Sequence, residues 1–170
     1  LGSPQSDMPN LQRIAAEQGC LIVSVDYRLA PETRYPGSLE DNYAGLRWLH
    51  DHADRLGVDP ARIVVMGESA GGGLAASLAQ MTRDRGGPQL AGQVLIYPML
   101  DWRTGGPDDR WKNAHTGEFI WTRAKNRFGW DSLRGDYSPK DARKGWFSPA
   151  LADDLSGLAP AYIATGALDL

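Results

Sequence analysis

Apolar residues along the chain fall into short runs, and these runs alternate with longer stretches of helical spacing. Four short apolar runs predict strands: residues 20–25, 63–66, 93–97 and 161–165. The first of them, rich in Val, Ile and Leu, is typical of a strand buried on both faces, as in a parallel sheet. Between the runs, apolar residues recurring every three or four positions predict three helices: residues 10–19, 38–57 and 70–85. This alternation predicts an α/β fold with a mostly parallel sheet and flanking helices.

Polar residues and glycines mark the expected ends of the helices. Residues 1–9 are polar and predict a loop, with Asn10 as the N-cap of the first helix. Ser38 is the expected N-cap of the second helix, with Asp41 reaching back as in a capping box. That second helix is expected to stop at Gly57.

The strand at 63–66 is followed by Gly67-Glu68-Ser69-Ala70-Gly71, and then by a helix of small residues. A G-x-S-x-G pentapeptide in a strand–turn–helix context is typical of a nucleophile elbow, which presents a serine hydroxyl at the tip of a strand. Such a turn strains the serine backbone, so side chains two residues before and after it are expected to clash. Glycines at both places would remove that clash.

The same turn predicts an oxyanion hole. The backbone N–H of Ala70 and the first-turn amides of the following helix are expected to face the space beside the Ser69 hydroxyl. The alternative interpretation is a glycine-rich turn in which Ser69 only caps the helix.

Residues 101–148 fit no simple strand–helix unit and carry five of the six tryptophans: Trp102, Trp111, Trp121, Trp130 and Trp146. We expect short helices and loops here, lying over the strand ends as a partial lid inserted in one domain of residues 1–170. The indoles then form an apolar wall for an acyl or alcohol group, or they simply pack the insert onto the sheet.

Composition narrows the class of protein. The chain has 170 residues, 42% hydrophobic content, 23% charged content and a net charge of −3, which suits one globular domain. Without a long Lys/Arg cluster, nucleic acid is not an expected partner. No apolar run approaches the roughly 20 residues that span a membrane. The lone Cys20 fits a reducing compartment, so a cytoplasmic location is expected. Because the chain starts at Leu1 rather than Met, and stops at Leu170 in an unfinished run, we expect a partial chain truncated at both ends.

Four segments in this order carry a family resemblance: Val-Asp-Tyr-Arg-Leu-Ala-Pro-Glu at 25–32, Gly-Glu-Ser-Ala-Gly-Gly at 67–72, Leu-Ile-Tyr-Pro-Met-Leu-Asp at 95–101, and Ala-Tyr-Ile-Ala-Thr-Gly-Ala-Leu-Asp-Leu at 161–170. Together they resemble the bacterial hormone-sensitive-lipase-like (family IV) carboxylesterases of the α/β-hydrolase fold. The resemblance implies a serine carboxylesterase that acts on small, short-acyl esters through an acyl-enzyme, with no cofactor and no metal. A homodimer is possible on this interpretation.

The resemblance also implies roles for particular residues. Ser69 matches the nucleophile, Asp169 matches the triad acid, and the N–H of Ala70 matches one oxyanion-hole donor. Glu68 stands where the family commonly has Asp. The family's His-Gly-Gly-Gly motif, which lies upstream of the 25–32 segment, has no counterpart, although residues 1–3 resemble the tail of the segment after it.

The triad histidine is expected downstream of Asp169, because the chain order in this fold is Ser, acid, His. His50 and His52 lie near the end of a predicted helix and have an expected surface or capping role, and His115 lies in the insert. The triad His is therefore not in this chain. The 170 residues alone are expected to be an inactive fragment.

Three alternatives stay open. A non-catalytic small-molecule-binding protein on the same scaffold is one, since plant gibberellin receptors resemble this family and lack the full triad. An amide or lactone hydrolase or a deacetylase is the second. A partial gene product with no function of its own is the third.

Overall fold

The computed structural model describes residues 3–138, 140–141 and 143–170, so Leu1 and Gly2 of the predicted upstream tail lie outside the described residues. The helices are α1 Pro4–Gln18, α2 Gly37–Asp51, α3 Ala53–Leu56, α4 Ala70–Asp84, α5 Arg123–Leu133 and α6 Lys144–Phe147. The strands are β1 Val64–Glu68, β2 Gly92–Ile96 and β3 Ala161–Ala164. The predicted strands at 63–66, 93–97 and 161–165 and the predicted helix at 70–85 are thus confirmed.

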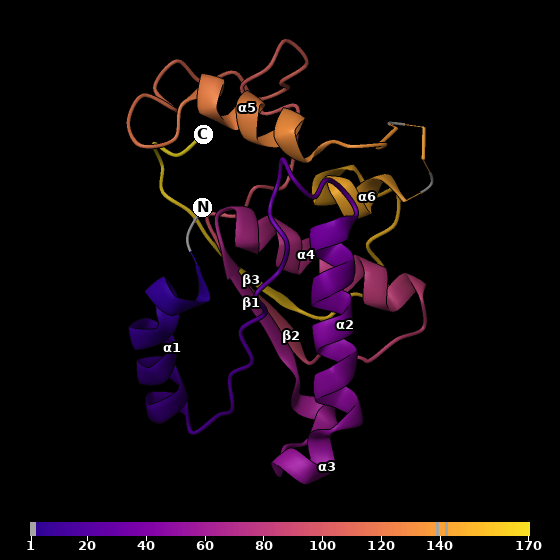
Figure 1. The fold of residues 1–170 in the computed structure, drawn as a ribbon. Coiled ribbons are helices and arrows are strands. Elements are labelled where there is room, and N and C mark those ends of the chain that lie inside the picture. Colours follow the sequence, from indigo (N-terminus) through magenta and orange to yellow (C-terminus); the bar gives the residue numbers. More distant parts are fainter. Residues whose placement is uncertain (1–2, 139, 142) are drawn as a thin grey trace.

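The three strands form one parallel sheet in the order β1-β2-β3 (Figure 1). Val65 lies opposite Gln93, and Leu95 lies opposite Ile163. Helix α4 makes the crossover from β1 to β2, which a parallel pair requires. The carboxyl ends of the strands consequently meet at one edge, where chemistry gathers in α/β sheets.

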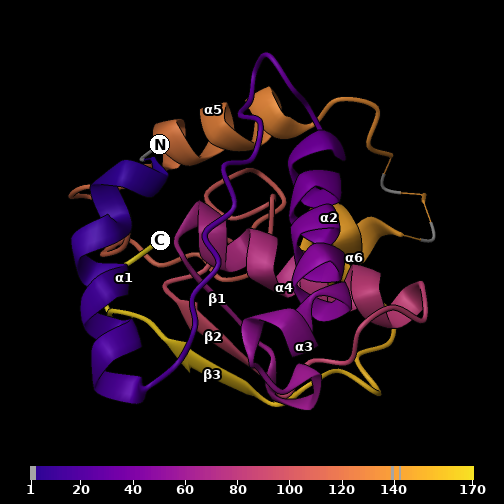
Figure 2. The ribbon, with the colours of Figure 1, turned by 60° about the horizontal axis from the view of Figure 1, so that its bottom comes forward.

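The core lies between the sheet and the helices α2, α4 and α6. Val65 and Leu95 point from the sheet into this core, where α4 contributes Ala75, Leu78 and Met81. Helix α1 lies on the other side of the sheet and buries none of its residues (Figures 1 and 2). The fold is the predicted α/β type, with the better-packed layer on the α4 side.

The predicted strand at 20–25 is wrong for this structure, because these residues form no ladder with any described strand. A strand is defined by backbone hydrogen bonds to a neighbour, and among the described residues β1 pairs only with β2. Leu21 remains 50% exposed and Val23 38% exposed. The run at 20–25 is therefore only partly covered: Ile22 and Val25 are half-buried, and Val25 lies against Gly45 of α2.

Two predicted helix starts are also corrected. Helix α1 begins at Pro4, not after Asn10, because Ser3 caps it: the Ser3 hydroxyl accepts a hydrogen bond from the Ser6 amide at 3.2 Å. The expected loop at 1–9 is thus mostly helix in its described part.

Helix α2 begins one residue before the expected cap. Pro36 occupies the N-cap position, so Ser38 lies inside the helix and Asp41 completes no capping box. The carboxylate of Asp41 instead accepts hydrogen bonds from the guanidinium and the backbone amide of Arg28. The predicted continuous helix to Gly57 breaks at His52, and Gly57 ends the short α3 with a left-handed φ of 68°.

An ion pair on the outer side of the core gives a prediction about stability. Arg85 donates two hydrogen bonds to the Glu40 carboxylate, at 2.6 and 2.8 Å, and lies between the rings of Tyr43 and Trp146. The hydrogen bond from Arg85 holds the pKa of Glu40 below its ordinary value of 4.5. A carboxyl group with a lowered folded pKa stabilises the fold above its unfolded pKa, and this contribution is lost as the pH falls through the folded pKa.

Glu40→Gln is therefore expected to lower the free energy of unfolding at pH 7 by about 0.5–1 kcal/mol. The difference from the unsubstituted chain should shrink as the pH falls below 4.5. Urea denaturation across the pH range measures this. Glu32→Gln is the control, because Glu32 forms no ion pair among the described residues. A deficit that stayed constant down to pH 3 would refute the electrostatic origin.

Candidate active site

Ser69 lies in the turn between β1 and α4, with φ of 54° and ψ of −119°. A non-glycine residue with positive φ is uncommon, and holding one there costs on the order of 1–3 kcal/mol unless the surroundings impose it. Here the turn imposes it, because the chain must reverse from a strand end into a helix within one residue. The strained serine expected of a nucleophile elbow is what the structure shows at this position.

The two glycines flanking the serine differ in their surroundings. A Cβ added to Gly67 would collide with the backbone carbonyl of Gly71, so position 67 has no room for a side chain. At Gly71 an added Cβ would meet nothing within 4 Å, so the expected steric need at that position is wrong. Glycine is instead required at positions 72 and 73. A Cβ at Gly72 would collide with Pro98, and a Cβ at Gly73 would collide with the Met99 carbonyl.

Backbone hydrogen bonds fix the turn to the end of β2. The Ser69 amide donates to the carbonyl of Ile96 at 2.9 Å, and the Met99 amide donates to the carbonyl of Ser69 at 3.0 Å. A third bond, from the Gly73 amide to the same Ser69 carbonyl at 3.1 Å, starts the helix. The position of Ser69 is therefore set by the sheet as well as by its own turn.

The side chain of Ser69 makes no capping hydrogen bond to α4. A serine that caps a helix takes extended backbone angles and accepts from the second or third amide of the helix. Neither property holds here, so the interpretation of Ser69 as a helix cap fails. The hydroxyl is left free for another use.

Ala70 is the first residue of α4, so its N–H has no acceptor within the helix. The other first-turn amides are in the same situation, and the helix dipole adds partial positive charge at this end. An oxyanion formed next to Ser69 would find these donors already oriented. The role of the Ala70 N–H as an oxyanion donor stays a prediction.

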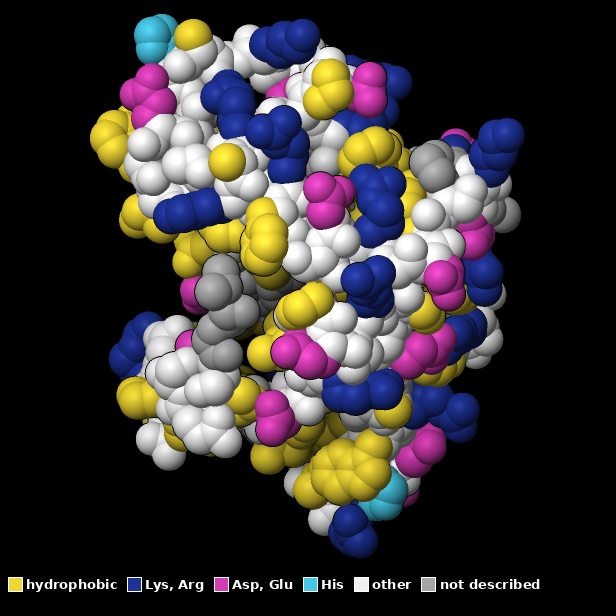
Figure 3. Space-filling model, turned by 45° about the horizontal axis from the view of Figure 1, so that its top comes forward, with side chains coloured by type: hydrophobic (Ala, Val, Ile, Leu, Met, Phe, Trp, Pro, Cys, Tyr) yellow, Lys and Arg dark blue, Asp and Glu magenta, His cyan; other side chains and the backbone are white. Residues whose placement is uncertain are grey.

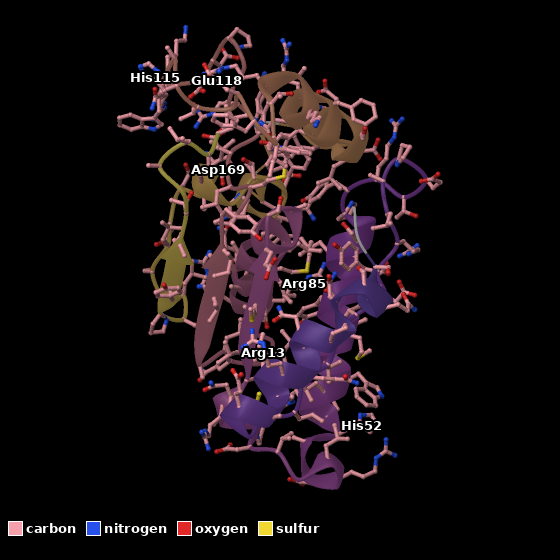
Figure 4. The ribbon with its side chains drawn as sticks, turned by 90° about the vertical axis from the view of Figure 1, so that its left-hand side faces the viewer. Arg13, His52, Arg85, His115, Glu118 and Asp169 are labelled. Atoms are coloured by element: carbon pink, nitrogen blue, oxygen red, sulfur yellow. The ribbon has the colours of Figure 1, made fainter. Side chains whose placement is uncertain are left out.

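Asp169 lies beyond β3, at the end of the molecule where the strands terminate (Figure 4). Its side chain is exposed and, among the described residues, accepts only a local hydrogen bond, from the Leu170 amide at 3.0 Å. The segment around it is held by the insert: the Gly117 amide donates to the Leu168 carbonyl at 3.4 Å, and the Leu170 side chain lies against Gly105 and Gly117. The triad role of Asp169 stays a prediction.

The three histidines are not hydrogen-bonded to Ser69 or to Asp169. His52 lies at the far end of the molecule from Asp169, stacked on Trp48 with its Nδ1 at 2.7 Å from the Trp48 carbonyl (Figure 4). His50 pairs with Asp51 next to it. His115 is in the insert, at the same end as Asp169, and its side chain is exposed (Figure 4). The surface role expected of His50 and His52 agrees with these contacts.

The insert at 101–148 is closed at its base. The Ser148 hydroxyl, which is fully buried, donates to the Leu100 carbonyl and accepts from the Trp102 amide, both at 3.1 Å. The Ala150 amide donates to the same Leu100 carbonyl at 3.0 Å. Helix α5 lies beyond the strand ends (Figure 1). The insert is thus anchored next to the carboxyl edge of the sheet.

Most of the tryptophans in the insert serve packing. Four of them are buried or half-buried: Trp102, Trp121, Trp130 and Trp146. Trp130 packs against the ring of Phe147 at 5.2 Å between centroids, and the Trp146 Nε1 donates to the Asp84 carboxylate at 2.7 Å. Trp111, at 86% exposed, is the exception.

The outer surface of the insert mixes apolar and basic side chains. Four large hydrophobic residues are more than half exposed there: Trp111, Phe119, Ile120 and Phe128. Figure 3 shows Lys and Arg side chains interspersed with hydrophobic ones over this end of the molecule. Within residues 3–138, 140–141 and 143–170, no His, Cys, Asp and Glu side chains gather as a metal site, and no helix is long and apolar enough to cross a bilayer.

One contact at the site had no signal in the sequence. The Tyr97 hydroxyl donates a hydrogen bond to Glu68 Oε2 at 2.9 Å, linking the residue before Ser69 to the residue after β2. Tyr97 lies far from Glu68 along the chain, and only the sheet register, with Glu68 opposite Ile96, brings the two together.

The family described as alpha/beta hydrolase fold matches the chain over residues 1–170. Carboxylesterase NlhH of Mycobacterium tuberculosis is 38% identical over 169 residues, which are 99% of this chain and 52% of that protein. Ethyl acetate hydrolase of Pseudomonas putida is 32% identical over 96% of this chain and 50% of its own length. The solved structure of a bacterial heroin esterase superposes with a TM-score of 0.85 and 37% identity, covering 97% of this chain and 52% of that one.

These comparisons agree on the share of each protein that is matched. The chain is matched almost completely, whereas it spans about half the length of the relatives it matches. The fold is therefore shared over nearly all of the 170 residues.

Proposed function

Because the chain belongs to the hormone-sensitive-lipase-like carboxylesterases of the α/β-hydrolase fold, we propose that the whole protein hydrolyses small, short-acyl esters with Ser69 as nucleophile. The observation that carries this proposal is the backbone of Ser69. Its φ of 54° presents a hydroxyl without a capping bond, next to the unpaired first-turn amides of α4. A small ester as substrate is supported by the ethyl acetate hydrolase among the relatives.

The proposed chemistry is acyl transfer in two steps. Ser69 Oγ attacks the ester carbonyl while a histidine base takes its proton, and the Ala70 N–H donates to the oxyanion. The C–O bond to the alcohol then breaks, and the histidine returns the proton to the leaving alcohol. Water, deprotonated by the same histidine, hydrolyses the acyl-serine and releases the carboxylic acid. Asp169 orients that histidine and stabilises its charged form.

The histidine base is proposed to come from sequence outside the 170 residues. Within the described residues, His50 and His52 lie at the far end of α2, and no histidine bonds Asp169. The remaining oxyanion donors are proposed to come from outside this chain as well. On this basis the 170 residues alone are expected to turn over esters poorly or not at all.

The relative rates on an ester and on the matching amide distinguish the proposed function from its alternatives. The whole protein is expected to hydrolyse p-nitrophenyl acetate at least about 100-fold faster than p-nitroacetanilide, the matching amide. Comparing kcat/KM for the two substrates measures this, because both release a chromophore from the same acetyl group. Faster amide cleavage would favour an amidase. Saturable binding of the ester without turnover would favour a non-catalytic binding protein.

A further inference from the structure

Tyr97 shares an unusual backbone conformation with Ser69. Among the described residues, the non-glycine residues with positive φ are these two, Ser69 at 54° and Tyr97 at 36°. They follow neighbouring strands at the same edge of the sheet, since Glu68 of β1 lies opposite Ile96 of β2. A residue with a bulky side chain rarely adopts a positive φ, because that conformation is strained. The surroundings must therefore hold Tyr97 in it.

Tyr97 donates two hydrogen bonds, one to each of the strands on either side of β2. The Tyr97 hydroxyl donates to Glu68 Oε2 at 2.9 Å, next to the nucleophile. The Tyr97 backbone amide donates to the Ala164 carbonyl at 2.6 Å, at the end of β3, which is the strand that leads to Asp169. One residue thus bridges the strand before Ser69 and the strand before Asp169.

We propose that Tyr97 is a positioning residue that sets the distance between the nucleophile turn and the segment carrying Asp169, through its hydroxyl bond to Glu68 and its amide bond to β3. This inference rests on the proposed ester hydrolysis by Ser69. Glu68 stands where the family commonly has Asp. In this proposal its carboxylate accepts the hydrogen bond from the Tyr97 hydroxyl. Misplacing catalytic groups by even a small distance lowers the rate of the chemical step more than it weakens substrate binding.

Tyr97→Phe removes the hydroxyl and leaves the ring and the backbone. In the whole protein, kcat for p-nitrophenyl acetate is expected to fall about 3- to 10-fold while KM changes by less than about twofold, because one hydrogen bond to an exposed carboxylate is lost. Tyr162→Phe is the matched control. Tyr162 is an exposed tyrosine on β3 whose hydroxyl makes no hydrogen bond among the described residues, and its substitution should leave kcat unchanged.

A double-mutant cycle tests the bond itself. Glu68→Ala is expected to lower kcat about as much as Tyr97→Phe, and the double variant should be no slower than either single variant. Glu68→Gln should lose less than Glu68→Ala, because the amide oxygen still accepts from the Tyr97 hydroxyl. Losses that multiply in the double variant, or a lower melting temperature with kcat intact, would overturn the positioning role.

A titration of the whole protein separates failure of this inference from failure of the proposed function. The hydrogen bond to Glu68, then burial and the nearby charges of Glu68 and Asp169, raise the pKa of Tyr97 above 10.0. NMR titration of ring-labelled tyrosines, assigned with Tyr97→Phe, should show this raised pKa and its return toward 10.0 in Glu68→Ala. If the whole protein cleaves no ester but this shift is seen, only the proposed function fails. If the shift is absent, the contact and the positioning role are both refuted.

Discussion

Replacing Ser69 with Ala in the whole protein is expected to lower kcat for p-nitrophenyl acetate by at least about a thousandfold. The backbone of the turn and the amides of α4 would remain, since the Ser69 side chain makes no capping hydrogen bond whose loss would disturb them. Oxyanion donors without a nucleophile give only a small residual rate over water. Steady-state hydrolysis of p-nitrophenyl acetate by the purified variant measures the loss.

Ser132→Ala is the matched control for this substitution. Ser132 is in α5, and within the described part of the chain its hydroxyl donates only to the Phe128 carbonyl in the same helix. Its substitution should leave kcat within about twofold, a surface change with little effect on the fold. If Ser69→Ala retained turnover comparable to that of Ser132→Ala, another residue would have to be the nucleophile.

Gly67→Ala is expected to lower the free energy of unfolding by at least about 3 kcal/mol, or to prevent folding. A methyl group at this position would collide with the Gly71 carbonyl, and that atom belongs to the backbone of the same turn. Neither β1 nor α4 can shift easily, because the turn is hydrogen-bonded to Ile96 and Met99. Urea denaturation followed by circular dichroism measures the change.

Gly71→Ala is the control for Gly67→Ala, and it is expected to raise the free energy of unfolding rather than lower it. Nothing lies within 4 Å of a Cβ at this position, and Gly71 is in the first turn of α4. An alanine there gains helix propensity and is expected to stabilise the chain by about 0.5–1 kcal/mol. Equal effects of the two substitutions would mean that the close approach at Gly67 is not what requires glycine.

The sequence identified the elements whose signals are local. Short β-branched runs gave β1, β2 and β3, and the strand–turn–helix context of Gly67–Gly71 gave the strained serine turn. The run at 20–25 is as apolar as these strands but forms no ladder, because pairing depends on a neighbouring strand that composition does not report. The same limit applies to Asp41, which is held by Arg28 from another segment rather than by its own helix.

At the site, the sequence predicted the strained serine turn and missed how that turn is held. Glycine at position 71 follows the motif without a steric reason, whereas Gly72 and Gly73 are required by a backbone that arrives from beyond β2. The Tyr97–Glu68 bond depends on strand register, so no spacing within the chain indicates it. The structure adds the contacts between strands that are distant in sequence.

The most direct test of the central claim is covalent trapping of the nucleophile. The whole protein is treated with a fluorophosphonate, which phosphonylates activated serines, and the adduct is located by intact mass and peptide mapping. One phosphonyl group on Ser69, with loss of ester turnover in proportion to labelling, is the expected result, and the Ser69→Ala variant should remain unlabelled. Labelling at another serine with Ser69 unmodified, or full turnover after stoichiometric modification of Ser69, would contradict its role as nucleophile.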